Sequence, residues 1–284
     1  MNKNKSGTMY IFWSVAIVAC LLLVLFALLF SSCSKGGEAK ASPSPTQPAV
    51  TESATPAPDP AATPPASVPP SAPPAASAYE LGETADAGQE YIDKLTFLGD
   101  STTHGLAAYG VLSGREDTTQ VWTPASGTLT LSNQSFATIV YPETKDEITI
   151  VEAVKRKLPE YLVITLGVNG VSFMDETYFT DEYTKLVKSV QEASPDTKII
   201  LNSIYPVEND YENIEYINNT NITAANGWIR KIAEATGVKF TNSAPVLTAA
   251  DGSLVEDYGN GDGIHLNATG YMKVLEYLRT HAYQ

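Results

Sequence analysis

The chain has 284 residues, of which 43% are hydrophobic and 18% charged, and its formal net charge is −14 at pH 7. This acidic balance argues against nucleic acids and anionic membrane surfaces as ligands, because both repel a negatively charged protein. Both cysteines, Cys20 and Cys33, lie near the N-terminus, so the folded domain predicted below depends on its core and contains no disulfide.

An uncharged apolar run opens the chain. Residues 9–30 supply about the 20 apolar residues that a helix needs to cross a bilayer. Lys3 and Lys5 precede the run, and by the positive-inside rule they place the N-terminus in the cytoplasm and the rest of the chain outside. The sequence FSSCSKGG resembles a bacterial lipoprotein signal, in which Cys33 is lipidated after cleavage.

Three fates of this segment stay open. The run is longer than a typical signal sequence, and Phe30 replaces the usual small aliphatic residue before the lipidated cysteine. These features favour an uncleaved transmembrane helix over lipidation of Cys33, and complete cleavage to a secreted protein is the third possibility. The first two predict a membrane-anchored, extracytoplasmic protein at a bacterial cell surface.

The next segment has the composition of a spacer. Residues 41–78 consist almost wholly of Pro, Ala, Ser and Thr and hold 12 of the 18 prolines. Such a segment buries too little apolar surface to offset its ordering entropy, so it is predicted to be disordered. Composition therefore divides the chain into a signal or membrane anchor (1–33), a disordered linker (34–87) and one folded domain (88–284).

In that domain, short apolar runs rich in β-branched residues alternate with amphipathic stretches. Strands are predicted at 95–99, 161–167, 197–206 and 237–243, and helices at 145–159, 175–195, 221–237 and 267–283. Residues 111–134 lack a clear period and are expected to include loop. The alternation predicts a single three-layer α/β/α domain with a mainly parallel sheet, in which sites form beyond the carboxyl ends of the strands.

The first predicted strand runs directly into Gly99, Asp100 and Ser101. A serine at this point projects its hydroxyl into the crevice, where the N–H groups that begin the next helix favour negative charge. The sequence therefore makes Ser101 a candidate nucleophile. The alternative is that Asp100 or Ser101 only caps the helix.

A serine hydroxyl needs a base to become a nucleophile, and the domain offers three histidines: His104, His265 and His281. Asp262 lies three residues before His265 in a glycine-rich loop, so its carboxylate can orient the imidazole toward Ser101. His104 is the rival base, because it follows Ser101 by three residues on the same predicted helix. His281 ends the last helix and is expected to be structural.

Two further residues can stabilise negative charge. Asn169 follows the second predicted strand, and its amide can donate to an oxyanion. Gly127 is the candidate for a backbone donor, since glycine permits close approach. Both are also ordinary turn residues. No cofactor and no metal are predicted, because the acidic stretch 256–263 lacks the ligand spacing of a calcium loop.

Together these motifs resemble the SGNH (GDSL-type) hydrolase family over about residues 93–284. The blocks that carry the resemblance are GDS at 99–101, LGVNG at 166–170 and DGIHLNATGY at 262–271. The third block ends in Gly170 where the family usually has Asp. The second block is not plainly recognisable and is assigned to the stretch around Gly127 by position.

The resemblance implies a flavodoxin-like fold and a Ser-His-Asp mechanism. Ser101 would be the nucleophile, His265 the base and Asp262 the residue that orients it. The N–H groups of Ser101 and Gly127 and the amide of Asn169 would form the oxyanion hole.

This implies a membrane-tethered serine esterase that removes acyl groups, such as acetyl, from a glycan or another ester. A monomer is expected, with no nucleic-acid partner. Trp122 lies near the presumed second block and can stack on a sugar ring, or it can belong to the core. The alternatives are a glycan-binding domain that has lost turnover, as Gly170 suggests, and an acyltransferase.

Overall fold

A five-stranded sheet, parallel throughout, forms the middle layer of the computed structural model, which describes residues 78–284. The strands follow the order β2-β1-β5-β6-β7, so β1 lies inside the sheet. Their bounds are Leu95–Gly99 for β1, Val121–Trp122 for β2, Tyr161–Thr165 for β5, Lys198–Asn202 for β6 and Lys239–Thr241 for β7. A short antiparallel hairpin, β3 (Thr138–Val140) and β4 (Glu147–Thr149), stands apart from this sheet.

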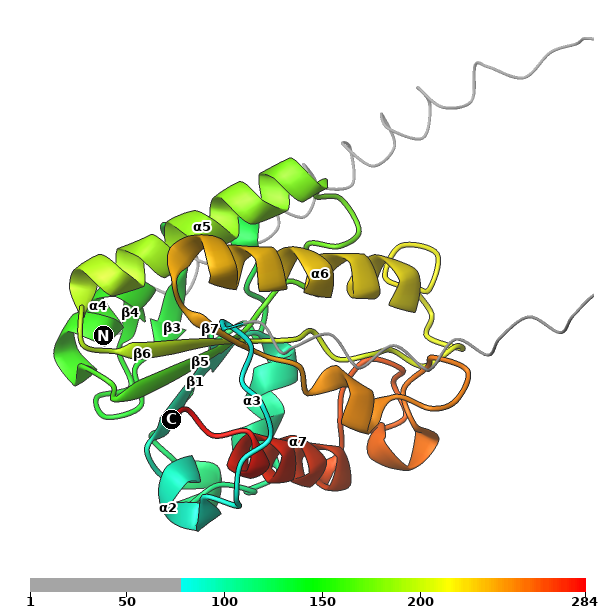
Figure 1. The fold of residues 1–284 in the computed structure, drawn as a ribbon, viewed down its shortest axis with the longest axis horizontal. Helices are drawn as coiled ribbons and strands as arrows, with labels where there is room; N and C mark the ends of the chain where they lie inside the picture. The colour runs from blue at the N-terminus through cyan, green and yellow to red at the C-terminus, as the bar shows by residue number, and fades with distance from the viewer. Residues whose placement is uncertain (1–77) are drawn as a thin grey trace, which may run out of the picture. The chain divides into compact units, whose positions relative to one another are not determined.

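Helices cover both faces of the sheet (Figure 1). One layer consists of α4 (Ile150–Lys157), α5 (Glu176–Ala193) and α6 (Asn219–Thr236), and the other of α2 (Gly88–Ile92), α3 (Ser101–Ala108) and α7 (Ala268–Thr280). Within residues 78–284, four 3₁₀ turns lie in the connections: η1 (Arg115–Asp117), η2 (Leu131–Asn133), η3 (Ala244–Leu247) and η4 (Glu256–Tyr258).

The strands bury both of their faces, which is why they read as continuous apolar runs. Successive residues point to opposite sides of the sheet: Leu98 packs toward α5 and α6, whereas Phe97 packs toward α7. All five residues of β1 and all five of β5 are buried. The predicted α/β/α architecture with a parallel sheet is thus confirmed.

One predicted helix is wrong at its start. Residues 145–159 divide into strand β4 and helix α4, because Glu147, Ile148 and Thr149 pair with β3. Thr149 is extended and its side chain accepts a hydrogen bond from the N–H of Glu152 at 3.3 Å, which caps the helix one residue later. The β-branched residues before the cap favour the strand.

The folded part also begins before residue 88, the boundary that composition predicts. The N–H of Leu81 donates to the Phe240 carbonyl at 2.8 Å, and that of Phe240 donates to the Tyr79 carbonyl at 2.7 Å, so this segment runs parallel to β7. Leu81 is buried in the core layer beside α7. The N–H of Ala87 then donates to the Arg279 carbonyl at 2.9 Å. Composition misses these contacts because they are made largely by backbone.

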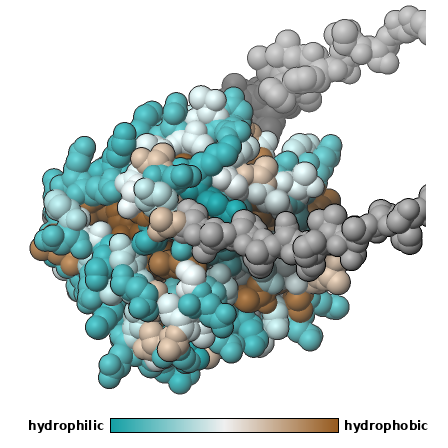
Figure 2. Space-filling model, in the orientation of Figure 1, coloured by the Kyte–Doolittle hydropathy of each residue, from teal (hydrophilic) through white to brown (hydrophobic). Residues whose placement is uncertain are grey.

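The predicted anchor and the linker up to residue 77 lie outside the described residues. Within residues 78–284, none of the helices is both long and apolar enough to span a bilayer. The face of the domain shown in Figure 2 is mostly hydrophilic, with smaller hydrophobic areas between the polar ones.

Candidate active site

Ser101 is the first residue of α3, where β1 ends at the carboxyl edge of the sheet. Asp100 caps this helix: its Oδ1 accepts hydrogen bonds from the Thr102 N–H at 3.0 Å and from the Thr102 hydroxyl at 2.7 Å. Gly99 makes the tight strand-to-helix turn, since a side chain there would clash with Thr103 and with the Thr165 carbonyl. As the first helical residue, Ser101 has an N–H without an intrahelical partner.

His265 and Asp262 meet Ser101 across 164 residues of sequence. The distance between His265 Nε2 and Ser101 Oγ is 2.8 Å, and that between His265 Nδ1 and Asp262 Oδ2 is 2.7 Å. The second contact fixes the proton on Nδ1 and leaves Nε2 free to accept from the serine hydroxyl. The three side chains thus form a hydrogen-bonded series in which Ser101 is the candidate nucleophile, His265 the candidate base and Asp262 the candidate orienting acid.

The loop that carries Asp262 also stabilises the negative charge of the Asp262 carboxylate. Burial raises the pKa of Asp262, but hydrogen bonds from the N–H groups of His265 and Ile264 and from the side chains of His265 and Asn260 outweigh it and lower the pKa to about 2. Both N–H groups donate to the same oxygen, Oδ1, at 2.9 and 3.0 Å. Asp262 is therefore ionised at neutral pH and keeps the imidazole oriented.

Asn169 contacts Asp100, the residue that precedes the candidate nucleophile Ser101. Its Nδ2 donates to Asp100 Oδ2 at 3.0 Å and, more weakly, to the Leu129 carbonyl at 3.4 Å. The carboxylate can only accept, so this contact settles which side of the amide faces Asp100. The second Nδ2 hydrogen makes the long contact and is the one that an oxyanion can recruit.

Gly127 also lies close to Ser101. It has a φ of +75°, and a Cβ built on it would stand 3.8 Å from the Ser101 Cβ. Its N–H, however, donates to the Pro124 carbonyl at 2.9 Å. This amide can serve an oxyanion only by sharing or exchanging that hydrogen bond.

The departure at Gly170 has a structural explanation. This glycine is buried, and a Cβ on it would lie 2.9 Å from the sulfur of Met174. Met174 is itself buried, with an exposed fraction of 4%. Met174 therefore fills the space that a side chain at position 170 would need.

Sequence reasoning misses the importance of Asp100, which it considers mainly as a helix cap. Asp100 is fully buried and contacts both Thr102 and Asn169. Burial raises its pKa, and the opposing hydrogen bonds from Thr102 and Asn169 and the charge of His265 leave it at about 6. The sequence does contain a signal for a role of Asp100 in the site, because this residue immediately precedes Ser101.

Three other candidates lie outside this constellation. His104 is exposed, and its Nδ1 is 3.4 Å from the Thr123 hydroxyl. The ring of His281 stacks on Tyr277 with centroids 3.8 Å apart. Trp122 is completely buried and belongs to the core, the alternative to stacking on a sugar ring. Among residues 78–284, no cluster of three or more His, Cys, Asp or Glu side chains could hold a metal ion.

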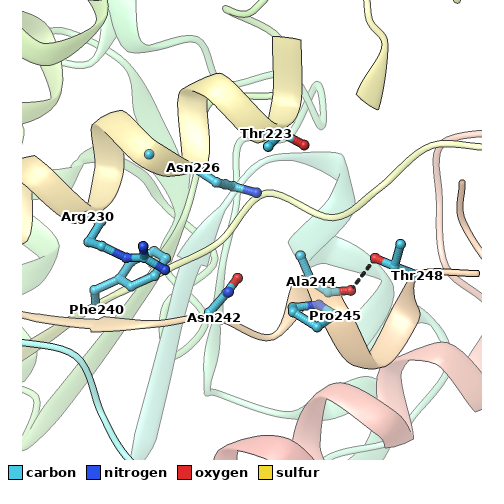
Figure 3. A pocket seen from close by; sticks show the side chains of 9 residues that line it. Thr223, Asn226, Arg230, Phe240, Asn242, Ala244, Pro245 and Thr248 are labelled. Atoms are coloured by element: carbon cyan, nitrogen blue, oxygen red, sulfur yellow. Dashed lines mark hydrogen bonds between the residues drawn. The ribbon is translucent and has the colours of Figure 1, made fainter. Parts of the chain in front are cut away.

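Figure 3 shows a hollow of about 290 Å³ beside α6 and η3, away from these residues. Its most polar side chains are already engaged. Asn226 receives a hydrogen bond from the Ile204 N–H at 2.7 Å and donates to the Ile204 carbonyl at 3.0 Å. Arg230 lies 3.3 Å from Glu80 and covers the Phe240 ring at 5.2 Å. This hollow therefore does not compete as the active site.

Comparison with known proteins agrees with the fold. The model of the GDSL-like Lipase/Acylhydrolase family matches residues 97–273. No curated protein sequence matches the chain at a significant level. A candidate acylhydrolase from Bacteroides fragilis has a similar structure, with 16% identity and a TM-score of 0.50 over 65% of this chain and 84% of that one.

Two further solved structures resemble the chain more distantly. A GDSL-like lipase from Bacteroides thetaiotaomicron is 20% identical, with a TM-score of 0.47 over 66% of this chain and 86% of that one. The periplasmic domain of a lipopolysaccharide acetyltransferase from Salmonella ser. Paratyphi A is 18% identical, with a TM-score of 0.45 over 70% and 84%. At these identities the likenesses concern the fold alone.

Proposed function

We propose that this chain, which belongs to the GDSL-like Lipase/Acylhydrolase family, is a serine esterase that removes acyl groups, such as acetyl, from a glycan or another ester. The observation that carries the proposal is the hydrogen-bonded series from Ser101 through His265 to Asp262, at 2.8 and 2.7 Å. A serine that only begins a helix needs no such partners. A nucleophile needs both.

The reaction proceeds through an acyl-enzyme. Ser101 Oγ forms a bond to the acyl carbon while its proton passes to His265 Nε2, and the same proton goes to the leaving alcohol oxygen as the ester C–O bond breaks. Water then attacks the acyl carbon and gives its proton to Nε2. That proton returns to Ser101 Oγ as the carboxylic acid leaves.

Charge that develops on the carbonyl oxygen is stabilised by three donors. The Ser101 N–H is free of intrahelical bonding, and Asn169 offers the hydrogen that now makes the long contact to Leu129. The Gly127 N–H contributes if it exchanges its bond to Pro124. Loss of one such donor typically costs a factor of about 10²–10³ in kcat.

Hydrolysis of a chromogenic acetyl ester tests this assignment. Ser101→Ala and His265→Ala are each expected to lower kcat by at least about 10³-fold, because nucleophile and base act as a unit. His104→Ala keeps most of the activity and serves as the matched histidine control. Loss of activity in His104→Ala with retention in His265→Ala would reverse the identity of the base.

The acceptor of the acyl group is a separate question. Acyl transfer to a sugar uses the same acyl-enzyme and replaces water by a hydroxyl group of the acceptor. Product analysis with an added oligosaccharide distinguishes the two, and we expect free acetate as the main product. Folded wild-type protein that turns over no ester would instead support a domain that only binds glycans.

We also propose that residues 9–30 hold the enzyme at the outer side of a membrane. The support is the uncharged apolar run and the lysines before it, Lys3 and Lys5. Cell fractionation should find the full chain in the membrane fraction, with its C-terminal part open to protease in intact cells. Release by Cys33→Ala would identify a lipid anchor, whereas protein found only in the medium would contradict tethering.

A further inference from the structure

A second hollow, of about 450 Å³, lies beside the loop that carries Gly127. We call it the Phe136 hollow; it is lined by Pro124, Ala125, Ser126, Thr128, Leu129, Thr130, Asn133, Phe136, Ala137, Thr138 and Glu147. Ser126 and Thr128 flank Gly127, where an added Cβ would stand 3.8 Å from the Ser101 Cβ. Leu129 supplies the carbonyl that Asn169 contacts. The hollow thus borders the loop that approaches Ser101 and Asn169.

We propose that the Phe136 hollow is the subsite for a neutral sugar ring of the substrate. The proposal rests on the esterase function proposed above and deepens it by naming the substrate class. The volume suits such a ligand, since small-molecule sites usually measure about 300–1,000 Å³.

The first argument is an aromatic ring turned to solvent. Phe136 is 68% exposed, more than any other large hydrophobic side chain in residues 78–284. A ligand that covers this ring removes its apolar surface from water, which favours binding. The negative face of an aromatic ring attracts the weakly positive C–H groups that a pyranose ring presents on one side.

The second argument is the polar lining around that ring. Four side-chain hydroxyls, the Asn133 amide and the Glu147 carboxylate border the hollow. Some are already oriented, as the Thr138 hydroxyl donates to Glu147 at 3.2 Å. Sugar hydroxyls both donate and accept, so they pair with such a mixed set. A long acyl chain would leave these groups without partners, which is costly.

The third argument is charge. Glu147 is the single ionisable side chain among the lining residues, and none of them is a lysine or arginine. A phosphate or uronate would meet a carboxylate with no cation to balance it. The hollow beyond Pro124 and Ala125 differs, since Glu116, Lys145 and His104 line it. The Phe136 hollow therefore favours an uncharged ring.

Binding separates this proposal from catalysis. The full chain carrying Ser101→Ala is titrated calorimetrically with partially O-acetylated xylo-, manno- and cello-oligosaccharides. Adding Phe136→Ala should raise Kd about tenfold, because loss of an aromatic contact costs about 1.4 kcal/mol, and Phe136→Trp should restore binding. Tyr216→Ala is the matched control, since this exposed tyrosine does not line the hollow.

Turnover gives the second readout. With Ser101 intact, Phe136→Ala should lower kcat/KM for the acetylated oligosaccharide about tenfold relative to that for p-nitrophenyl acetate. An unchanged ratio, or absence of binding by all three oligosaccharides, would overturn the subsite while esterase activity stands. A selective loss of p-nitrophenyl octanoate hydrolysis would assign the hollow to an acyl chain and overturn it too. Sugar binding that depends on Phe136 without any ester turnover would refute the esterase alone.

Discussion

Asp100 connects the helix that begins with Ser101 to Asn169, the candidate oxyanion donor. One carboxylate oxygen holds the first turn of α3 through Thr102, and the other holds the amide of Asn169. A buried charge is costly unless hydrogen bonds satisfy it. The family motif places an aspartate here, and the structure gives it a physical task beyond capping: to fix the orientation of the Asn169 amide.

We predict that Asp100→Asn lowers kcat about tenfold to a hundredfold, the cost of a lost hydrogen bond to a charged group. An amide at position 100 can accept or donate, so it no longer dictates which side of Asn169 faces it. The KM for a small acetyl ester should change little. Ester kinetics check this, and a variant with unchanged kcat would show that Asn169 needs no such support.

Asp100→Asn should also change how the stability of the protein depends on pH. The folded-state pKa of Asp100, about 6, lies above its ordinary value of 3.8. The unfolded chain therefore loses this proton first, and the carboxyl's contribution to stability, complete below pH 3.8, is lost as pH rises through 6. The Tm of Asp100→Asn relative to wild type should rise between about pH 4 and pH 8. A constant difference would mean that this group does not titrate there.

Sequence alone went far for some residues and not for others. Ser101, Asp262 and His265 were expected to converge because parallel strands bring their carboxyl ends to one edge, and they do lie in contact. The core alternative for Trp122 is confirmed by its complete burial, but strand β2 was not predictable, since it has only two residues and no visible alternation. The hydrogen bond from the Gly127 N–H to the Pro124 carbonyl depends on a turn that the local sequence pattern does not predict.

At the scale of elements, α3 depends on close packing against α7. Gly105 of α3 leaves room for the ring of Tyr271, and the Tyr271 hydroxyl donates to the Thr102 carbonyl at 2.6 Å. Both contacts lie within the helix that begins with Ser101. The helix that begins with the candidate nucleophile, Ser101, is thus positioned by the helix that follows the His265 loop.

We predict that Gly105→Ala destabilises the protein by about 1–3 kcal/mol, because an added Cβ collides with the buried Tyr271 ring. Urea unfolding measures the change. The control is Gly227→Ala in α6, where a Cβ meets nothing within 4 Å and should stabilise the helix by up to about 1 kcal/mol. Equal effects of the two substitutions would contradict the packing account.

Element prediction succeeded where apolar runs were long and failed where they were short. The five residues of β1 were predicted at their observed bounds, and α5 and α7 within a few residues. Strand β4 was assigned to a helix because three residues give too little alternation to distinguish the two periods. Its pairing with β3 is a tertiary contact that the local sequence does not encode.

At the scale of the molecule, the segment 79–87 turns the end of a composition-defined linker into part of the domain. It extends the sheet beside β7 and then follows α7. Covering the edge of β7 in this way shields a strand that would otherwise be open to pairing with other chains.

Leu81 tests that boundary. Leu81→Ala should lower the free energy of unfolding by about 2 kcal/mol or more, since it removes a buried side chain from the core layer beside α7. Glu83→Ala, two residues further on and exposed, should have little effect. Thermal or urea unfolding of the full chain measures both variants. If Leu81→Ala left the free energy of unfolding unchanged, the folded domain would begin at residue 88, as composition predicts.

The central claim is that the Ser101 hydroxyl becomes reactive because His265 accepts its proton and Asp262 orients His265. Labelling the full chain with a fluorophosphonate, followed by peptide mapping, tests it most directly. We predict a single labelled residue, Ser101, with labelling slowed by at least about 10³-fold in His265→Ala. Folded protein that takes up no label, or that carries it on another residue, would contradict the claim.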